Sequence, residues 1–238
     1  MKAIRMLALL VAIIAILLLI VAGPGTRAGI WNFRTGLAML RWAFYAGILG
    51  IVLVLLAVII TRPRASGIAV LVVALILAVV ACVVPWGFYQ KAKGVPPIHD
   101  ITTDTQDPPQ FVAVLPLRAG AANPATYGGD SVAAQQRRGY PDIQPLHLDV
   151  APAQAYARAL DAARSMGWQI DAADSTAGRI EATATTSWFG FRDDVVVRVR
   201  PDSTGSRVDV RSVSRVGKSD IGTNAARVRA YLAKLRGR

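Results

Sequence analysis

Asp193 and Asp194 are adjacent carboxylates at the start of an alternating apolar stretch. Two carboxylates can divide the roles of acid and base when their surroundings separate their pKa values. Neighbouring side chains in a strand, however, point to opposite faces of the sheet. We therefore expect a turn residue and one exposed aspartate at this place, and not a pair acting on one substrate.

A second candidate lies where a helix is expected to begin, at Asp220, Gly222 and Asn224. Free backbone N–H groups and the helix dipole favour an anion at such a position. A phosphate or an anionic head group would also meet the nearby basic side chains of Arg211, Arg215 and Lys218. Asp220 supports the other interpretation, because its own carboxylate can cap the free donors. Both interpretations stay open.

The histidines offer two short pairs, His99 with Asp100 and His147 with Asp149. Neither belongs to an HExxH pattern, and Cys82 is the single cysteine, so we expect no metal site and no internal disulfide. The sequence also lacks a G-x-S-x-G, a Walker loop and a dinucleotide fingerprint. We expect no cofactor and name no catalytic residue.

A third group of candidates is the basic face of a predicted hairpin, carried by Arg198, Arg200, Arg207 and Arg211 with Asp209 among them. Such a face is usually a solvated sheet surface. It could also contact anionic lipid or an acidic partner, at ~1 kcal/mol for each basic group near the lipid. The candidate binding residues are therefore Arg198, Arg200, Arg211, Arg215, Lys218, Asp220 and Asn224.

The elements that must position these residues lie between 195 and 235. Valines alternate with polar residues over 195–200 and again over 207–211, which predicts an antiparallel hairpin with one apolar face. The alternation slips at 212–213, where a bulge is expected. An apolar stripe then predicts a helix that covers the valine face, formed by Ile221, Val228, Tyr231, Leu232 and Leu235.

The charge of the chain is divided unevenly. Residues 1–94 contain nine Lys or Arg and no Asp or Glu, whereas residues 95–238 contain eighteen basic and fifteen acidic residues. The formal charge of +12 thus comes mostly from a hydrophobic segment with isolated basic residues, which is typical of a membrane protein and argues against nucleic acid as a partner.

Three apolar runs, at about 4–22, 36–60 and 67–84, are long enough to cross a hydrocarbon core of roughly 30 Å. The first run also has the basic start of a secretory signal, but it exceeds the usual apolar length of such signals. Basic residues lie on both sides of the three spans. We take the tight Arg62-Pro63-Arg64 turn and the amino terminus as cytoplasmic, which places the carboxy-terminal domain in the periplasm of a bacterial inner membrane.

The remaining chain divides into a proline-rich tether over 94–109 and a soluble domain over 110–238. We expect a short strand in 110–117, a long loop over 118–139, a helix after Pro152 and two further strands before the hairpin. The order β-α-β-β-β-β-α predicts an α+β domain, in which two helices cover one face of an antiparallel sheet.

Four further segments stand out, at 97–104, 140–143, 191–200 and 211–227. Together they resemble the bacterial and plastid family called domain of unknown function 1499. The resemblance covers most of residues 95–236, and its most specific part is 211–227. The family implies no activity, cofactor or catalytic residue, and its membrane-anchored members resemble this chain in their leading helices.

These observations favour a non-enzymatic, membrane-anchored envelope protein whose domain binds a protein or lipid partner. A hydrolase that uses Asp193 or Asp220 is the first alternative. An accessory subunit of a transport system is the second, weakened because the three spans contain no central ionisable residue.

Overall fold

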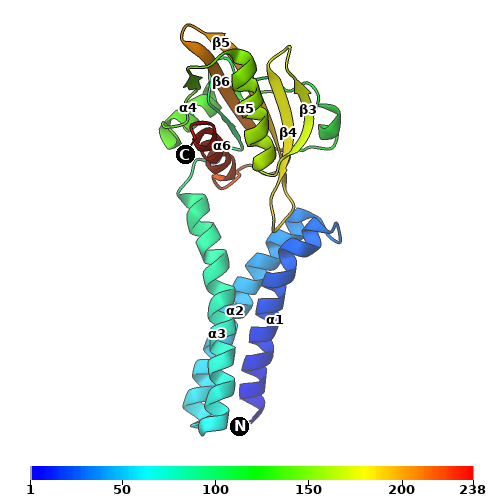
Figure 1. Ribbon diagram of the computed structural model, residues 1–238. Helices are drawn as coiled ribbons and strands as arrows, with labels where there is room; N and C mark the ends of the chain where they lie inside the picture. Colours follow the sequence, from blue (N-terminus) through cyan, green and yellow to red (C-terminus); the bar gives the residue numbers. More distant parts are fainter. Residues whose placement is uncertain (1, 238) are drawn as a thin grey trace. The chain divides into compact units, whose positions relative to one another are not determined.

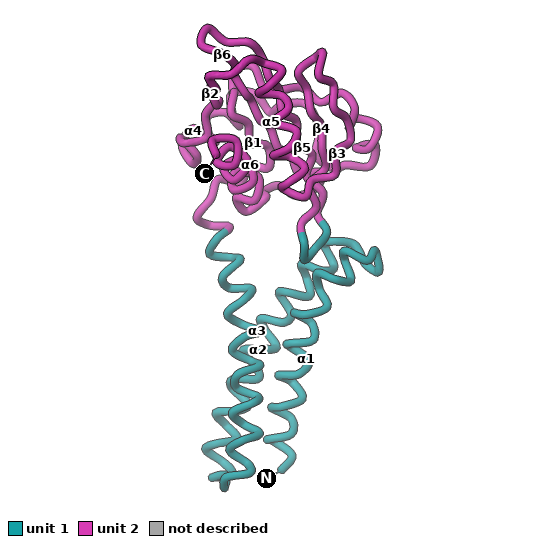
Figure 2. The backbone as a smooth tube through the Cα atoms, viewed as in Figure 1, with its two compact units in different colours: residues 1–91, 187–190 teal, residues 92–186, 191–238 magenta. Residues whose placement is uncertain are grey.

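The computed structural model describes residues 2–237, which form two compact units. Unit 1 comprises the chain up to Lys91 together with Ser187–Gly190, and unit 2 comprises Ala92–Thr186 and Phe191 onward. The two units are drawn in teal and magenta in Figure 2.

Unit 1 is built from three helices, α1 (Lys2–Arg27), α2 (Phe33–Thr61) and α3 (Ala65–Lys93). The last two residues of α3 belong to unit 2. All three are long and apolar enough to cross a membrane, and each extends beyond its predicted span. Their buried positions are mostly small residues, whereas large aliphatic side chains point outward. Small residues let helix backbones approach closely in lipid, where burial of apolar surface supplies little driving force. The prediction of three apolar amino-terminal helices is confirmed.

Unit 2 contains a six-stranded antiparallel sheet (Figure 1). Strands β3 (Gln169–Asp174), β4 (Arg179–Thr185), β5 (Arg192–Asp202) and β6 (Gly205–Ser214) follow one another in space as in the sequence. Two short strands, β1 (Asp100–Thr102) and β2 (Leu146–Leu148), pair with different stretches of β6. β6 therefore holds together segments that are far apart in the chain.

Helices α5 (Pro152–Ser165) and α6 (Thr223–Leu235) cover one face of this sheet (Figure 1). The alternate valines of β5 and β6 that point to this face are almost completely buried, together with Tyr231 and Trp168, whose rings stack at 4.9 Å. Burying such side chains is the main favourable term in folding, at roughly 1.5–3 kcal/mol each. The α+β class and the two-helix cover are confirmed.

The segment from 94 to 139 differs from the expectation. β1 and the buried Pro108 and Pro109 lie within the stretch interpreted as a tether, so this stretch is part of the folded domain. The strand predicted in 110–117 is wrong, because turns and the short helix η1 (Pro116–Arg118) occupy it. The predicted loop after it contains helix α4 (Gly129–Gly139).

The bulge expected at Ser212–Val213 is also wrong. β5 and β6 stay in register there, and the irregularity lies instead in β3, between Ile170 and Ala172. The alternation only seemed to slip, because Val213 is an apolar residue on the face opposite the helices. There it packs with Phe111, Val114 and Val196.

Candidate functional site

The sheet face opposite the two helices is lined by charged side chains and is covered by the segment from 103 to 127. Alternate residues of β4, β5 and β6 point to this face. The covering segment forms ion pairs and backbone hydrogen bonds with their side chains. The ionic face is defined by a set of charged residues from β4, β5 and β6 together with Arg215, which follows β6 directly. They are Arg179, Glu181, Asp194, Arg198, Arg200, Arg207, Asp209, Arg211 and Arg215.

Arg211 lies at the centre of the ionic face and is fully buried. Its guanidinium forms a bidentate pair with Asp100 of β1, with Nε–Oδ1 3.0 Å and Nη2–Oδ2 2.8 Å. It also donates to the carbonyl oxygens of Pro109 and Ala125. Removing one member of a buried pair leaves an uncompensated charge, so we assign Arg211 a structural role.

Asp194 organises a second buried cluster. Arg118 of η1 pairs with its carboxylate, Arg215 donates to it at 2.7 Å, and Thr183 donates to it at 3.1 Å. The neighbouring Asp193 lies on the helix-covered face, where Arg227 donates to it at 2.6 Å. The expectation that these two carboxylates point to opposite faces is confirmed, and neither is the exposed aspartate that was expected.

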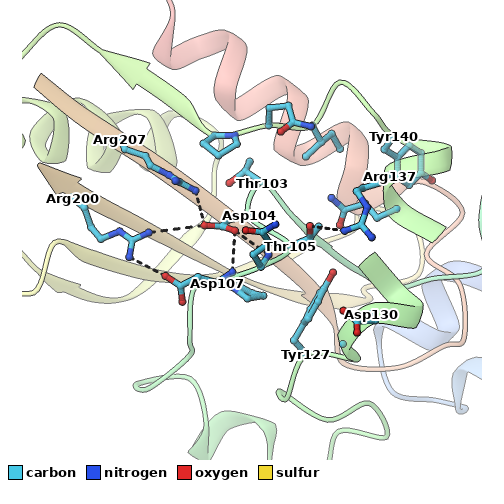
Figure 3. Close-up of a pocket in the computed structure, with 17 residues that line it drawn as sticks. Thr103, Asp104, Thr105, Asp107, Tyr127, Asp130, Arg137, Tyr140, Arg200 and Arg207 are labelled. Carbon is cyan, nitrogen blue, oxygen red and sulfur yellow. Dashed lines mark hydrogen bonds and ion pairs between the residues drawn. The ribbon is translucent and has the colours of Figure 1, made fainter. Parts of the chain in front are cut away.

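A polar pocket of about 1000 Å³ lies at the margin of the ionic face. Figure 3 shows it between the 103–108 segment, helix α4 and the ends of β5 and β6. Its charged lining residues are three basic and three acidic side chains, so the formal charge of the lining is zero. They are Asp104, Asp107, Asp130, Arg137, Arg200 and Arg207.

Asp104 fixes the geometry of the pocket wall. One carboxylate oxygen accepts hydrogen bonds from the backbone N of Gln106 and of Asp107, each at 3.0 Å, and the other accepts from Arg207 at 2.5 Å. Asp107 in turn accepts from Arg200 at 2.9 Å. Hydrogen bonding to Arg200, the largest cause, lowers the pKa of Asp107 below its ordinary value. These links are drawn in Figure 3.

Two tyrosines contribute aromatic surface to the pocket lining. Burial, with a smaller contribution from the Asp100 carboxylate, raises the pKa of Tyr127 to about 12. Burial also raises the pKa of Tyr140. Within the described residues, neither hydroxyl finds a hydrogen-bond partner. Arg137, which donates to Thr105 at 3.2 Å, is an exposed cation on the same wall.

The candidate binding residues proposed from the sequence do not form one site in the structure. Arg200 lines the pocket, and Arg198 lies behind it with ion pairs to Asp107 and Asp209. Arg211 and Arg215 are held in the buried clusters described above. The interpretation of the basic face as an open, solvated surface is corrected, because aspartates of the 100–107 stretch and the covering segment neutralise and bury much of it.

The start of α6 belongs to the other face of the sheet. Asp220 accepts hydrogen bonds from the backbone N of Gly222 at 2.9 Å and of Asn224 at 2.6 Å, so its carboxylate caps the first turn of α6 from two residues before Gly222, the N-cap residue. Burial raises the pKa of Asp220, although these hydrogen bonds act in the opposite direction. Asn224 is buried and donates to the carbonyl oxygen of His99, and Lys218 is exposed. The carboxylate of Asp220 thus occupies the donors that an anion would need.

Pocket residues that the sequence did not mark as a site include Asp104, Arg137 and Tyr127. The only signal for the wall was the presence of three aspartates in the supposed tether and of four arginines on the hairpin. Among residues 2–237, no three potential ligands gather to hold a metal ion, and His147 pairs with Asp202 instead of with Asp149.

Comparison with known protein families gives a match in the carboxy-terminal unit. A family model described as "Protein of unknown function (DUF1499)" matches residues 100–235. The match begins at β1, which agrees with the position of that strand in the sheet. No curated protein matches the chain.

Proposed function

The chain belongs to the DUF1499 family of proteins of unknown function, and from that premise we propose that it is a membrane-anchored, non-enzymatic binding protein. Its anchor is the three-helix unit, and its binding site is the polar pocket of unit 2. The ligand is the polar head group of a membrane lipid. We place the protein in a bacterial inner membrane with unit 2 in the periplasm.

One observation carries the proposal. The pocket is large and polar, the formal charge of its lining is zero, and its wall is fixed by the hydrogen bonds of Asp104. Such a lining offers fixed donors and acceptors without an excess charge, which suits a hydroxyl-rich or zwitterionic head group. Anchoring in a membrane keeps the pocket at a high effective concentration of lipid.

The hydrolase alternative receives no support from the two carboxylates on which it depends. Asp193 is buried against Arg227, and Asp220 caps a helix. Neither lines the pocket, and no His or Cys is among the described residues that do. An acid and base pair requires groups within reach of one substrate.

The test uses the full-length chain in bacterial membranes. A photo-crosslinking residue replaces Gln144, which is exposed on the pocket lining, or the matched exposed Gln154 of α5. Mass spectrometry should find lipid bound at position 144 and not at 154, and Arg207→Met should reduce that capture because it releases Asp104. Capture of protein alone at position 144, or equal lipid capture at both positions, would overturn the proposal.

Orientation has its own test. A reporter that is active only in the periplasm, fused after Arg238, should give signal. Signal from a reporter that works only in the cytoplasm would show that the proposed orientation is reversed.

A further inference from the structure

The charged residues that line the polar pocket do not all pair with one another. Arg207 pairs with Asp104, and Arg200 pairs with Asp107. The remaining two lie on helix α4, and neither forms an ion pair with any residue between 2 and 237. They are Asp130 and Arg137. The pocket therefore presents one unpaired anionic side chain and one unpaired cationic side chain to a ligand.

The two unpaired charges are separated along one side of α4. Arg137 follows Asp130 by two helical turns, which is ~10 Å of rise. Side chains on a helix lean toward its amino terminus, so the guanidinium of Arg137 reaches back along the side that carries Asp130. Both side chains are exposed and line the same pocket (Figure 3). A ligand that carries both charges can span the space between them.

Tyr127 adds an unused hydrogen-bond donor to this part of the pocket. Burial is the largest cause of its raised pKa, but the charges that act on it include Arg137, which lowers the pKa, and Asp130, which raises it. Its hydroxyl is buried and finds no hydrogen-bond partner within the described residues. A buried donor without an acceptor is unfavourable. A ligand oxygen that accepts from this hydroxyl would remove that cost.

The guanidinium of Arg137 suits a phosphate. Its one hydrogen bond among the described residues goes from Nη1 to the hydroxyl of Thr105 at 3.2 Å, so most of its N–H donors remain available. Arginine recognises phosphate through parallel hydrogen bonds to two oxygens. Tyr127 can donate a further hydrogen bond to the same group.

The carboxylate of Asp130 suits a primary ammonium. An ionised carboxylate only accepts hydrogen bonds, and a primary ammonium only donates them. A quaternary ammonium has no N–H group and is recognised mainly by the faces of aromatic rings. Asp130 therefore selects a cation that carries N–H donors.

From these observations we infer that the pocket binds a phosphate ester with a primary ammonium group, of the phosphoethanolamine type, whose phosphate lies at Arg137 and whose ammonium lies at Asp130. The inference rests on the proposed function, because it names the head group that the proposed site takes. It excludes a purely hydroxyl-rich head group, which would leave both charges of α4 unpaired.

The experiment is calorimetric titration of the full-length protein in detergent with glycerophosphoethanolamine, which is the head group without its acyl chains. Glycerol phosphate, which lacks the ammonium, should bind at least about ten-fold more weakly, because it makes no charge-assisted hydrogen bond to Asp130. Arg137→Gln should weaken both compounds about ten-fold. Asp130→Asn should weaken glycerophosphoethanolamine about ten-fold and should not weaken glycerol phosphate.

Matched controls lie close to both positions. Arg138 is the next residue of α4 and is exposed, but it does not line the pocket, and the same holds for the exposed Asp149. Arg138→Gln and Asp149→Asn should leave both affinities unchanged. Asp130 and Arg137 are exposed and unpaired, so the melting temperature of their variants without ligand should not change and serves as the folding control.

Equal affinity of the wild type for the two compounds, or equal losses for Arg137→Gln and Arg138→Gln, would overturn the inference. Photo-capture at position 144 in membranes distinguishes the sources of the ligand. Phosphatidylethanolamine enriched over its share of the membrane lipids supports the inference and the proposed function together. Enrichment of another head group supports the proposed function and overturns the inference. The expected titrations without any lipid capture support the inference for a free phosphoethanolamine compound and overturn the proposed lipid ligand.

Discussion

The buried pair of Arg211 and Asp100 has an exposed counterpart of the same chemistry, so one experiment can isolate the effect of burial. Arg229 and Asp142 also form a bidentate pair, with Nε–Oδ2 2.6 Å and Nη2–Oδ1 2.7 Å. Their side chains are 43% and 54% exposed, whereas those of Arg211 and Asp100 are 0% and 6% exposed. The two ion pairs therefore differ in their access to water, and Arg211 makes two additional hydrogen bonds to carbonyl oxygens.

Arg211→Met should lower the free energy of unfolding by about 3–5 kcal/mol, because the Asp100 carboxylate stays buried without its cation. The carbonyl oxygens of Pro109 and Ala125 also lose a donor. At about 4 °C for each kcal/mol in a domain of this size, the melting temperature should fall by about 12–20 °C. Arg229→Met should cost less than about 1 kcal/mol, because water replaces an exposed pair.

The assay is thermal melting of the full-length protein in detergent, in which proteolytic cleavage within residues 192–214 detects unfolding. The double variant Asp100→Leu with Arg211→Met should recover part of the loss, since it leaves no buried charge unpaired. Equal shifts of the melting temperature for Arg211→Met and Arg229→Met would refute the reasoning, because burial would then make no difference.

Three further predictions concern single positions. Asp220→Ala should cost ~1 kcal/mol through loss of the cap, measured by thermal melting; a variant as stable as wild type and newly stabilised by phosphate would show an anion site instead. Because the pKa of Tyr127 is raised from 10.0 to about 12, the unfolded chain loses this proton first, so stability should fall as pH rises between these values. A Tyr127→Phe variant with an unchanged pH profile of unfolding would contradict that. Gly178→Ala should cost more than ~1 kcal/mol, because Gly178 has φ +62° and its new Cβ would lie 2.2 Å from the carbonyl oxygen of Val199; Gly120→Ala, with open space around it, is the control in the same melting assay.

The sequence predicts those parts of the fold whose periodicity is local. Alternating valines in β5 and β6 and the stripe ending at Leu235 define the helix-covered face, because burial there depends on one residue type at a regular spacing. The same argument misleads at 110–117. Phe111 and Val114 are buried while Val112 and Leu115 are exposed, so a rich apolar run folds as turns whose N–H groups bind Glu181.

The pocket could be predicted much less well, because its charges are matched across long distances in sequence. Arg207 meets Asp104, and Arg200 meets Asp107, from a stretch that reads as a proline-rich linker. β1 is only three residues long and has no periodicity of its own. The predicted basic surface is neutralised only when these arginines and aspartates pair in the folded domain.

The position of β1 also has a consequence for the time course of biosynthesis. Asp100 pairs with Val213, which the ribosome adds more than a hundred residues later. At about 5–20 residues per second, the first strand waits on the order of 5–20 s for its neighbour. During that interval Asp100 lacks Arg211, and the segment that follows it has no sheet to cover. β1 can therefore pair only after β6 has been synthesised, and a chain interrupted before β6 would leave the first strand without a partner.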